Sequence, residues 1–122
     1  MANGRLAAIN ITSYDSDTLV YTVPEDIYSM LNITVCNRST FNRTIRVAVT
    51  DLAAPQITDW IEYNVNLVAN GAYEASGVVA GPGQTVWVHV VATGQGASPD
   101  CNCVITGFEQ PNVVPQPELG AA

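Results

Sequence analysis

The stretch DWIEYNVNLVANGAYEASGVVAGPGQTVWVHVV, residues 59–91, alternates strands with turns. From residue 61 to residue 67 apolar and polar residues alternate strictly, which predicts a half-buried strand because successive side chains point to opposite faces. The residues expected to point inward are Ile61, Tyr63, Val65 and Leu67, and those expected on an inert outer face are Glu62, Asn64 and Asn66. Asn70-Gly71 and Gly81-Pro82-Gly83 are turn signals that separate this strand from the next two. The stretch therefore predicts antiparallel sheet.

The same pattern recurs along the rest of the chain. Further strands are expected at residues 6–12, 18–23, 27–36, 44–49 and 101–108, and the third of these places Leu31, Ile33 and Val35 inward. No segment has the three-and-four spacing of an amphipathic helix. About eight short strands joined by Gly, Pro and Asn turns predict an all-β protein with a single antiparallel β-sandwich. A jelly-roll and an immunoglobulin-like topology are both compatible with this pattern.

The character of the sequence changes after Glu109. The β-sandwich domain is therefore expected to span residues 1–109, and residues 110–122 are expected to form an extended, proline-rich C-terminal arm, close to polyproline II. An arm of this kind loses little entropy when it docks on a neighbouring subunit. The residues expected to contact a partner are Arg5, Pro111, Val113, Val114, Pro115, Pro117 and Leu119.

Charge and hydropathy exclude two classes of partner. Eleven carboxylates and four arginines give a net charge of −7, which argues against nucleic acid because phosphate contact needs a cationic surface. No run approaches the ~20 apolar residues that span a bilayer, so no membrane partner is expected. The first ten residues do not resemble a signal peptide, which predicts that the protein is made and kept in a cytoplasm. Charged residues are only 12% of the chain, which suits a protein that packs against neighbours.

The three cysteines are not arranged as a metal site. Cys101 and Cys103 form a C-x-C pair, and no second pair completes a zinc site. We expect small, buried, reduced side chains. A disulfide from Cys36 to either of the other two remains an alternative, if their strands are neighbours.

No motif predicts catalysis or a cofactor. His89 is the only histidine and lies on a strand, where a cross-strand hydrogen bond is expected. Asp15-Ser16-Asp17 lacks the glycine and the distant glutamate of a calcium loop, so Asx-turns with its own backbone are expected. We therefore predict no catalytic, cofactor-binding or metal-binding residues, and no enzyme.

Four aromatic residues give an alternative binding function. Trp60, Tyr63, Tyr73 and Trp87 could line a platform for a sugar, as in carbohydrate-binding or adhesion modules. Against this, the alternation of the strand places Tyr63 in the core.

Several short segments resemble one family. They are Tyr21-Thr-Val-Pro24, Val35-Cys-Asn-Arg38, Val47-Ala-Val49, Trp60-Ile-Glu-Tyr63, Ala69-Asn-Gly71 with Glu74 and Gly77, and Gly107-Phe-Glu109. In this order the chain resembles small β-sandwich virion proteins of tailed bacteriophages from about Ala7 to Glu109. The proline-rich segment after Glu109 departs from the compact versions of that family.

The resemblance implies a structural function in the virion. A capsid decoration (cement) protein that stabilises the head is the first expectation, and an accessory protein of the neck, tail or baseplate is the alternative. The implied partners are the major capsid protein or other virion proteins. The implied state is a homo-oligomer or lattice, assembled in the host cytoplasm.

Overall fold

The computed structural model describes residues 3–111, which form eight antiparallel β-strands in two four-stranded sheets. The strands are β1 (Asn3–Ile11), β2 (Asp17–Thr22), β3 (Ile27–Asn37), β4 (Arg43–Thr50), β5 (Trp60–Leu67), β6 (Ala72–Ala80), β7 (Thr85–Val91) and β8 (Cys101–Pro111). The prediction of an all-β protein with about eight strands is confirmed.

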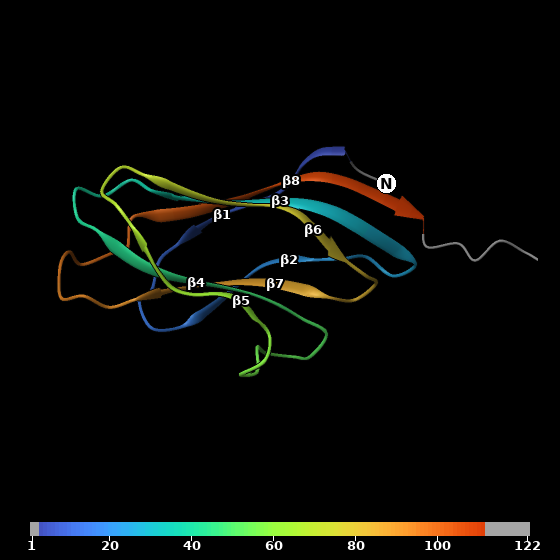
Figure 1. Ribbon diagram of the computed structural model, residues 1–122, viewed down its shortest axis with the longest axis horizontal. Coiled ribbons are helices and arrows are strands. Elements are labelled where there is room, and N and C mark those ends of the chain that lie inside the picture. Colours follow the sequence, from blue (N-terminus) through green and yellow to red (C-terminus); the bar gives the residue numbers. More distant parts are fainter. Residues whose placement is uncertain (1–2, 112–122) are drawn as a thin grey trace, which may run out of the picture.

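The order of the strands distinguishes between the two expected topologies. One sheet has the order β1-β8-β3-β6 and the other β2-β7-β4-β5 (Figure 1). The antiparallel pairs are β4 with β5, β3 with β6, β2 with β7 and β1 with β8. In the sequence each pair encloses the one before it, as in a single long hairpin, and successive pairs alternate between the two sheets. This connectivity is that of a jelly roll. An immunoglobulin-like order would place the first two strands side by side in one sheet.

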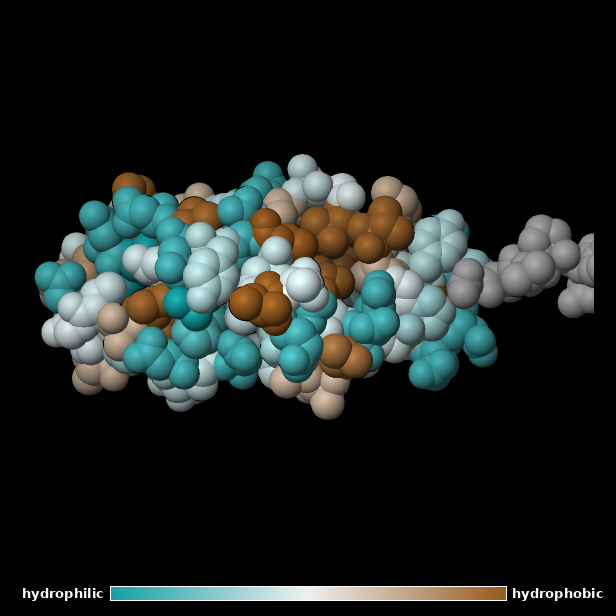
Figure 2. Space-filling view, turned by 60° about the horizontal axis from the view of Figure 1, so that its bottom comes forward, coloured by the Kyte–Doolittle hydropathy of each residue, from teal (hydrophilic) through white to brown (hydrophobic). Residues whose placement is uncertain are grey.

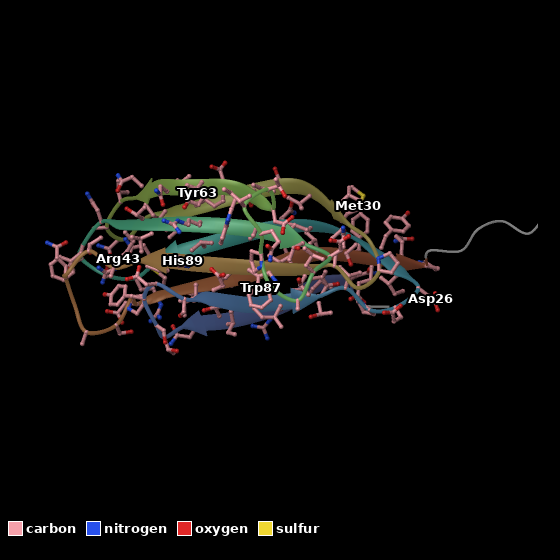
Figure 3. All side chains as sticks on the ribbon, turned by 90° about the horizontal axis from the view of Figure 1, so that it is seen from below. Asp26, Met30, Arg43, Tyr63, Trp87 and His89 are labelled. Carbon is pink, nitrogen blue, oxygen red and sulfur yellow. The ribbon has the colours of Figure 1, made fainter. Side chains whose placement is uncertain are left out.

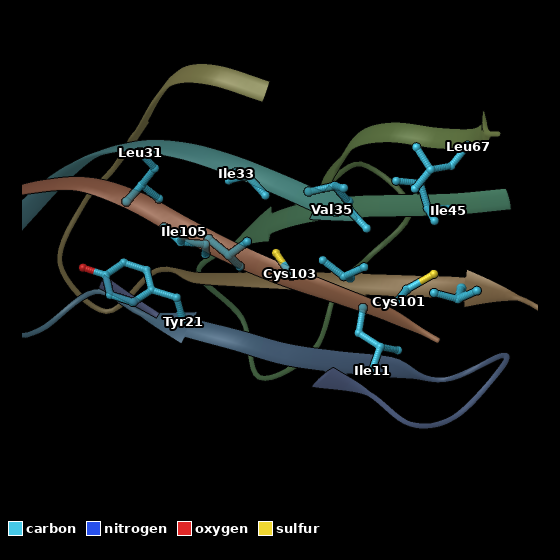
Figure 4. Packing of buried hydrophobic residues seen from close by; sticks show 14 of the residues in the cluster. Ile11, Tyr21, Leu31, Ile33, Val35, Ile45, Leu67, Cys101, Cys103 and Ile105 are labelled. Carbon is cyan, nitrogen blue, oxygen red and sulfur yellow. The ribbon is translucent and has the colours of Figure 1, made fainter. Parts of the chain in front are cut away.

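The hydrophobic core lies between the two sheets (Figure 4). Leu31, Ile33 and Val35 of β3 are buried as predicted, and every second residue of β7 from Val86 to Val90 is buried with them. The two inward-facing cysteines of β8 also belong to this core. Simple alternation therefore predicts the inward face of β3 correctly, and β7 follows the same period of two.

The prediction for β5 is wrong in its first half. Ile45 pairs with Val65, and Val47 pairs with Glu62. One residue of β4 therefore lies opposite two residues of β5. The extra residue is a β-bulge, and Asn64 within it has a φ of 58°. This bulge places Tyr63 outward, where it is exposed. A second register shift follows between Val47 and Ala48, whose partners are Glu62 and Trp60, and Ile61 between these partners is exposed as well.

Glu62 is also not part of an outer polar face. Its partner Val47 is fully buried, and residues directly opposite each other share a face. Glu62 accordingly forms a hydrogen bond with Tyr73 of β6, which belongs to the other sheet. Burial, and then the bond and charge of Glu62, raise the pKa of Tyr73 to about 12. The contact links the two sheets where β5 and β6 form their edges.

β8 ends later than expected. Gln110 pairs with Tyr28 and Pro111 with Ile27, two residues beyond the predicted domain boundary at Glu109. A proline is tolerated here because it is the last residue of the strand. The other predicted contact residues of the arm, Val113, Val114, Pro115, Pro117 and Leu119, lie outside the described residues.

The three thiols are free. Cys36 follows the buried Val35 on β3 and is partly exposed, whereas Cys101 and Cys103 point into the core. Cys36 therefore lies on the opposite face of its sheet from the other two thiols. The alternative of a disulfide from Cys36 is not realised.

This arrangement predicts the order in which the thiols react. Burial raises the pKa of the Cys103 thiol to about 12 and also raises the pKa of Cys101, so almost no thiolate forms on either at about pH 8. In the native protein, Ellman's reagent should label a single thiol, Cys36, and all three should react after unfolding in guanidinium. The Cys36→Ser variant should show no fast phase. A second fast thiol in the native protein would contradict the burial of Cys101 and Cys103.

Candidate functional site

The outer face of the β2-β7-β4-β5 sheet carries two adjacent cross-strand rows. The polar row consists of Asp17, His89, Arg46 and Asn64, and the aromatic row consists of Leu19, Trp87, Ala48 and Trp60. Each row crosses the four strands in the order β2, β7, β4 and β5. Figure 3 shows Tyr63, Trp87 and His89 of this region on one side of the molecule.

The polar row begins at a fixed imidazole. His89 Nδ1 lies 2.8 Å from Asp17 Oδ1, and Nε2 lies 3.9 Å from Asp15 Oδ1. The His89 side chain is only 12% exposed. The expected cross-strand histidine is confirmed. The side chains of Asp15 and Asp17, however, bond β7 and the residue after it, and not the backbone of their own turn. Asp17 bonds His89, and Asp15 Oδ1 accepts a hydrogen bond from the Ala92 amide at 2.9 Å.

Arg46 is held by the bulge of β5. Its Nε donates to Asn64 Oδ1 at 2.8 Å, and its guanidinium carbon lies 4.2 Å from the centre of the Tyr63 ring. A guanidinium at this distance is attracted by the ring electrons. The bulge thus places Tyr63 outward and orients a cation over it.

A hollow of about 390 Å³ opens beside these residues and is lined by Ile57, Trp60 and Tyr63. The ring centres of Trp60 and Tyr63 are 5.8 Å apart at 69°, and those of Trp60 and His89 are 6.3 Å apart at 86°. Ile57, from the loop between β4 and β5, is 91% exposed. Figure 2 shows this side of the molecule, where hydrophobic side chains lie among hydrophilic ones.

The structure brings together three of the four aromatic residues considered for a platform. Trp60, Tyr63 and Trp87 share this face, whereas Tyr73 lies on the other sheet and bonds Glu62. The inward position expected for Tyr63 is wrong because of the bulge. Sequence reasoning missed Arg46 and Ile57. The sequence signal closest to the bulge is Asn64, a residue type that tolerates positive φ.

The opposite sheet has an exposed apolar row of its own, which we name the Met30 row. Met30 pairs with Val79 on one side and with Phe108 on the other, and all three side chains are exposed. The row lies at the end of the sheet where β1 begins and β8 ends (Figure 1). Arg5 and Pro111, two of the predicted contact residues, are exposed at this same end.

Within residues 3–111 no group of three or more His, Cys, Asp or Glu side chains is placed to hold a metal ion. The same part of the chain contains no helix that is long and apolar enough to cross a membrane. No protein-family model and no curated protein matches the sequence.

Proposed function

We propose that this chain is a structural virion protein of a tailed bacteriophage, and that it decorates and reinforces the head. The observation that carries the proposal is the Met30 row. Three exposed apolar side chains on three neighbouring strands form a surface that gains free energy when a partner covers it. The resemblance to small virion β-sandwiches gives the class of partner, which is the major capsid protein.

The position of the row supports this partner. Asn3 pairs with Phe108, so β1 brings the N-terminal end of the described chain beside the row, and Pro111 follows three residues later on β8. Both ends of the described chain thus adjoin one apolar surface. Segments that leave a sandwich at such a surface can bridge neighbouring capsomers, and we propose that the protein forms a lattice on the shell in this way.

Decoration of a shell also suits the physical chemistry of a small inert sandwich. A protein that binds only the assembled shell stabilises it by RT ln(1 + [L]/Kd) at each site. Many copies on one shell make weak single contacts sufficient. No enzymatic activity, cofactor or nucleic-acid partner is part of the proposal, and its setting is the virion.

The test is rebinding to capsids stripped of decoration. The wild-type protein should rebind and should raise the temperature at which the shell opens. Met30→Glu should weaken rebinding by at least about tenfold, because it places a charge in the centre of an apolar contact. Leu52→Glu, at another exposed apolar position, in the loop between β4 and β5, should bind like the wild type.

Two results would contradict decoration of the head. Absence of wild-type binding to the shells would reject it outright. A copy number of tens per particle, measured by quantitative mass spectrometry of virions, would place the protein in the neck, tail or baseplate, since decoration requires hundreds of copies.

A further inference from the structure

We infer that the outer face of the β2-β7-β4-β5 sheet binds a neutral, hexopyranose-containing glycan at the hollow between Trp60, Tyr63 and Ile57. This site lies on the opposite sheet from the Met30 row and does not depend on the virion function. The inference is carried by the two parallel rows, which together offer one apolar strip and one strip of fixed polar groups.

The aromatic row and the hollow require a ligand with an apolar side. Tyr63 is 55% exposed and Ile57 is almost fully exposed, although both border a pocket of ligand size. Ala48 is fully buried although it lies on this outer face, between its partners Trp60 and Trp87 on the two neighbouring strands, so larger side chains cover the strand here. The C–H face of a pyranose ring can pack on such a surface.

The polar row requires that the same ligand carries groups that both donate and accept hydrogen bonds. Asp17 presents a carboxylate, Arg46 a guanidinium, and Asn64 a side-chain amide. His89 and the Asn64–Arg46 bond hold these groups in place before any ligand arrives. Adjacent sugar hydroxyls can donate to the carboxylate and accept from the guanidinium at the same time.

Other ligand classes fit the face less well. A nucleic acid would also use aromatic rings and arginine, but its phosphates would meet Asp15 and Asp17 on a protein of net charge −7. A lipid chain or a purely apolar protein surface would cover the polar row without offering partners, and burying unpaired polar groups is costly. A neutral sugar avoids both penalties.

The experiment is a titration of the full chain with cellohexaose, maltohexaose, mannohexaose and chitohexaose, followed by tryptophan fluorescence and calorimetry. We expect saturable binding of at least one of these oligosaccharides. Tyr63→Ala should weaken it at least about tenfold, Tyr63→Phe should keep most of it, and Ile57→Ser should weaken it severalfold. Phe108→Ala, an exposed aromatic position on the other sheet, is the matched control and should bind like the wild type.

Two outcomes would overturn the inference: no saturable binding of any of the four oligosaccharides, or equal binding by the wild type and the Tyr63→Ala and Ile57→Ser variants. Ile57→Ser is the second variant because the Ile57 side chain is exposed to solvent, so its replacement should not destabilise the fold. A failure of the sugar-binding inference can be distinguished from a failure of the proposed virion function. Met30→Glu should weaken capsid rebinding and leave sugar binding unchanged, whereas Tyr63→Ala should weaken sugar binding and leave capsid rebinding unchanged.

Discussion

Replacing Gly107 with alanine is expected to lower the free energy of unfolding by about 3 kcal/mol or more. Gly107 has a φ of 146°, and a Cβ atom there would lie 1.9 Å from the carbonyl oxygen of Met30. That oxygen belongs to the backbone of β3 and cannot rotate away. Gly107 is paired with Leu31 on one side and with Gly4 on the other, so relief requires β8 to move against both neighbouring strands.

Gly4→Ala is the matched control, because Gly4 lies directly opposite Gly107 in the same sheet. It also has a positive φ, 94°, but a Cβ atom there would meet nothing within 4 Å. It should therefore carry only the backbone strain, about 1–2 kcal/mol. Urea unfolding of both variants measures the difference. Equal losses would show that the close approach of β8 to β3 is not what requires the glycine.

The parts of the fold that follow from local alternation could be predicted from the sequence. In β3 and β7 every second residue points inward without a break. The buried positions from Leu31 to Val35 and from Val86 to Val90 therefore match a period of two. The same reasoning fails for β5 because its register with β4 shifts twice, between the partners of Ile45 and Val47 and again between those of Val47 and Ala48. A bulge depends on how β5 pairs with β4, and that pairing is not visible in either strand alone.

The candidate site depends still more on pairing between distant strands. Asp17 and His89 are 72 residues apart, yet they form the first half of the polar row. Arg46 became part of the site only because β4 lies between β7 and β5. The sequence could suggest that Trp60, Tyr63 and Trp87 bind a ligand together. It could not show that Tyr73 lies on the other sheet, since the order of strands decides this.

Arg43 is a second feature that the sequence did not reveal. It is the first residue of β4 and only 1% exposed, although it carries a charge. Its guanidinium donates to the backbone carbonyls of Gln95 at 2.8 Å, Ser98 at 3.2 Å and Pro99 at 2.9 Å. These acceptors all belong to the loop between β7 and β8, so one side chain fixes the course of that loop.

Two aromatic rings complete the surroundings of Arg43. Its guanidinium carbon lies 5.5 Å from the centre of the Tyr14 ring and 5.6 Å from that of Phe41. The Tyr14 hydroxyl also lies 2.9 Å from the Gln95 carbonyl oxygen and the same distance from that of Ser98. Arg43 and Tyr14 therefore hold the same loop from two directions.

Arg43→Met is accordingly expected to lower the free energy of unfolding by about 3 kcal/mol, because it removes three charge-assisted hydrogen bonds from a buried guanidinium to the backbone of one loop. Amide hydrogen exchange should accelerate in residues 92–100 before the rest of the sandwich. Arg43→Lys should recover only part of the loss, since an ammonium lacks the planar fork that reaches three carbonyls.

Arg38→Met is the control: Arg38 bonds Asn10 and Asn102 in solvent, so its loss should cost less than about 1 kcal/mol. A uniform rise in exchange over all strands would mean that Arg43 stabilises the whole domain and not the loop in particular.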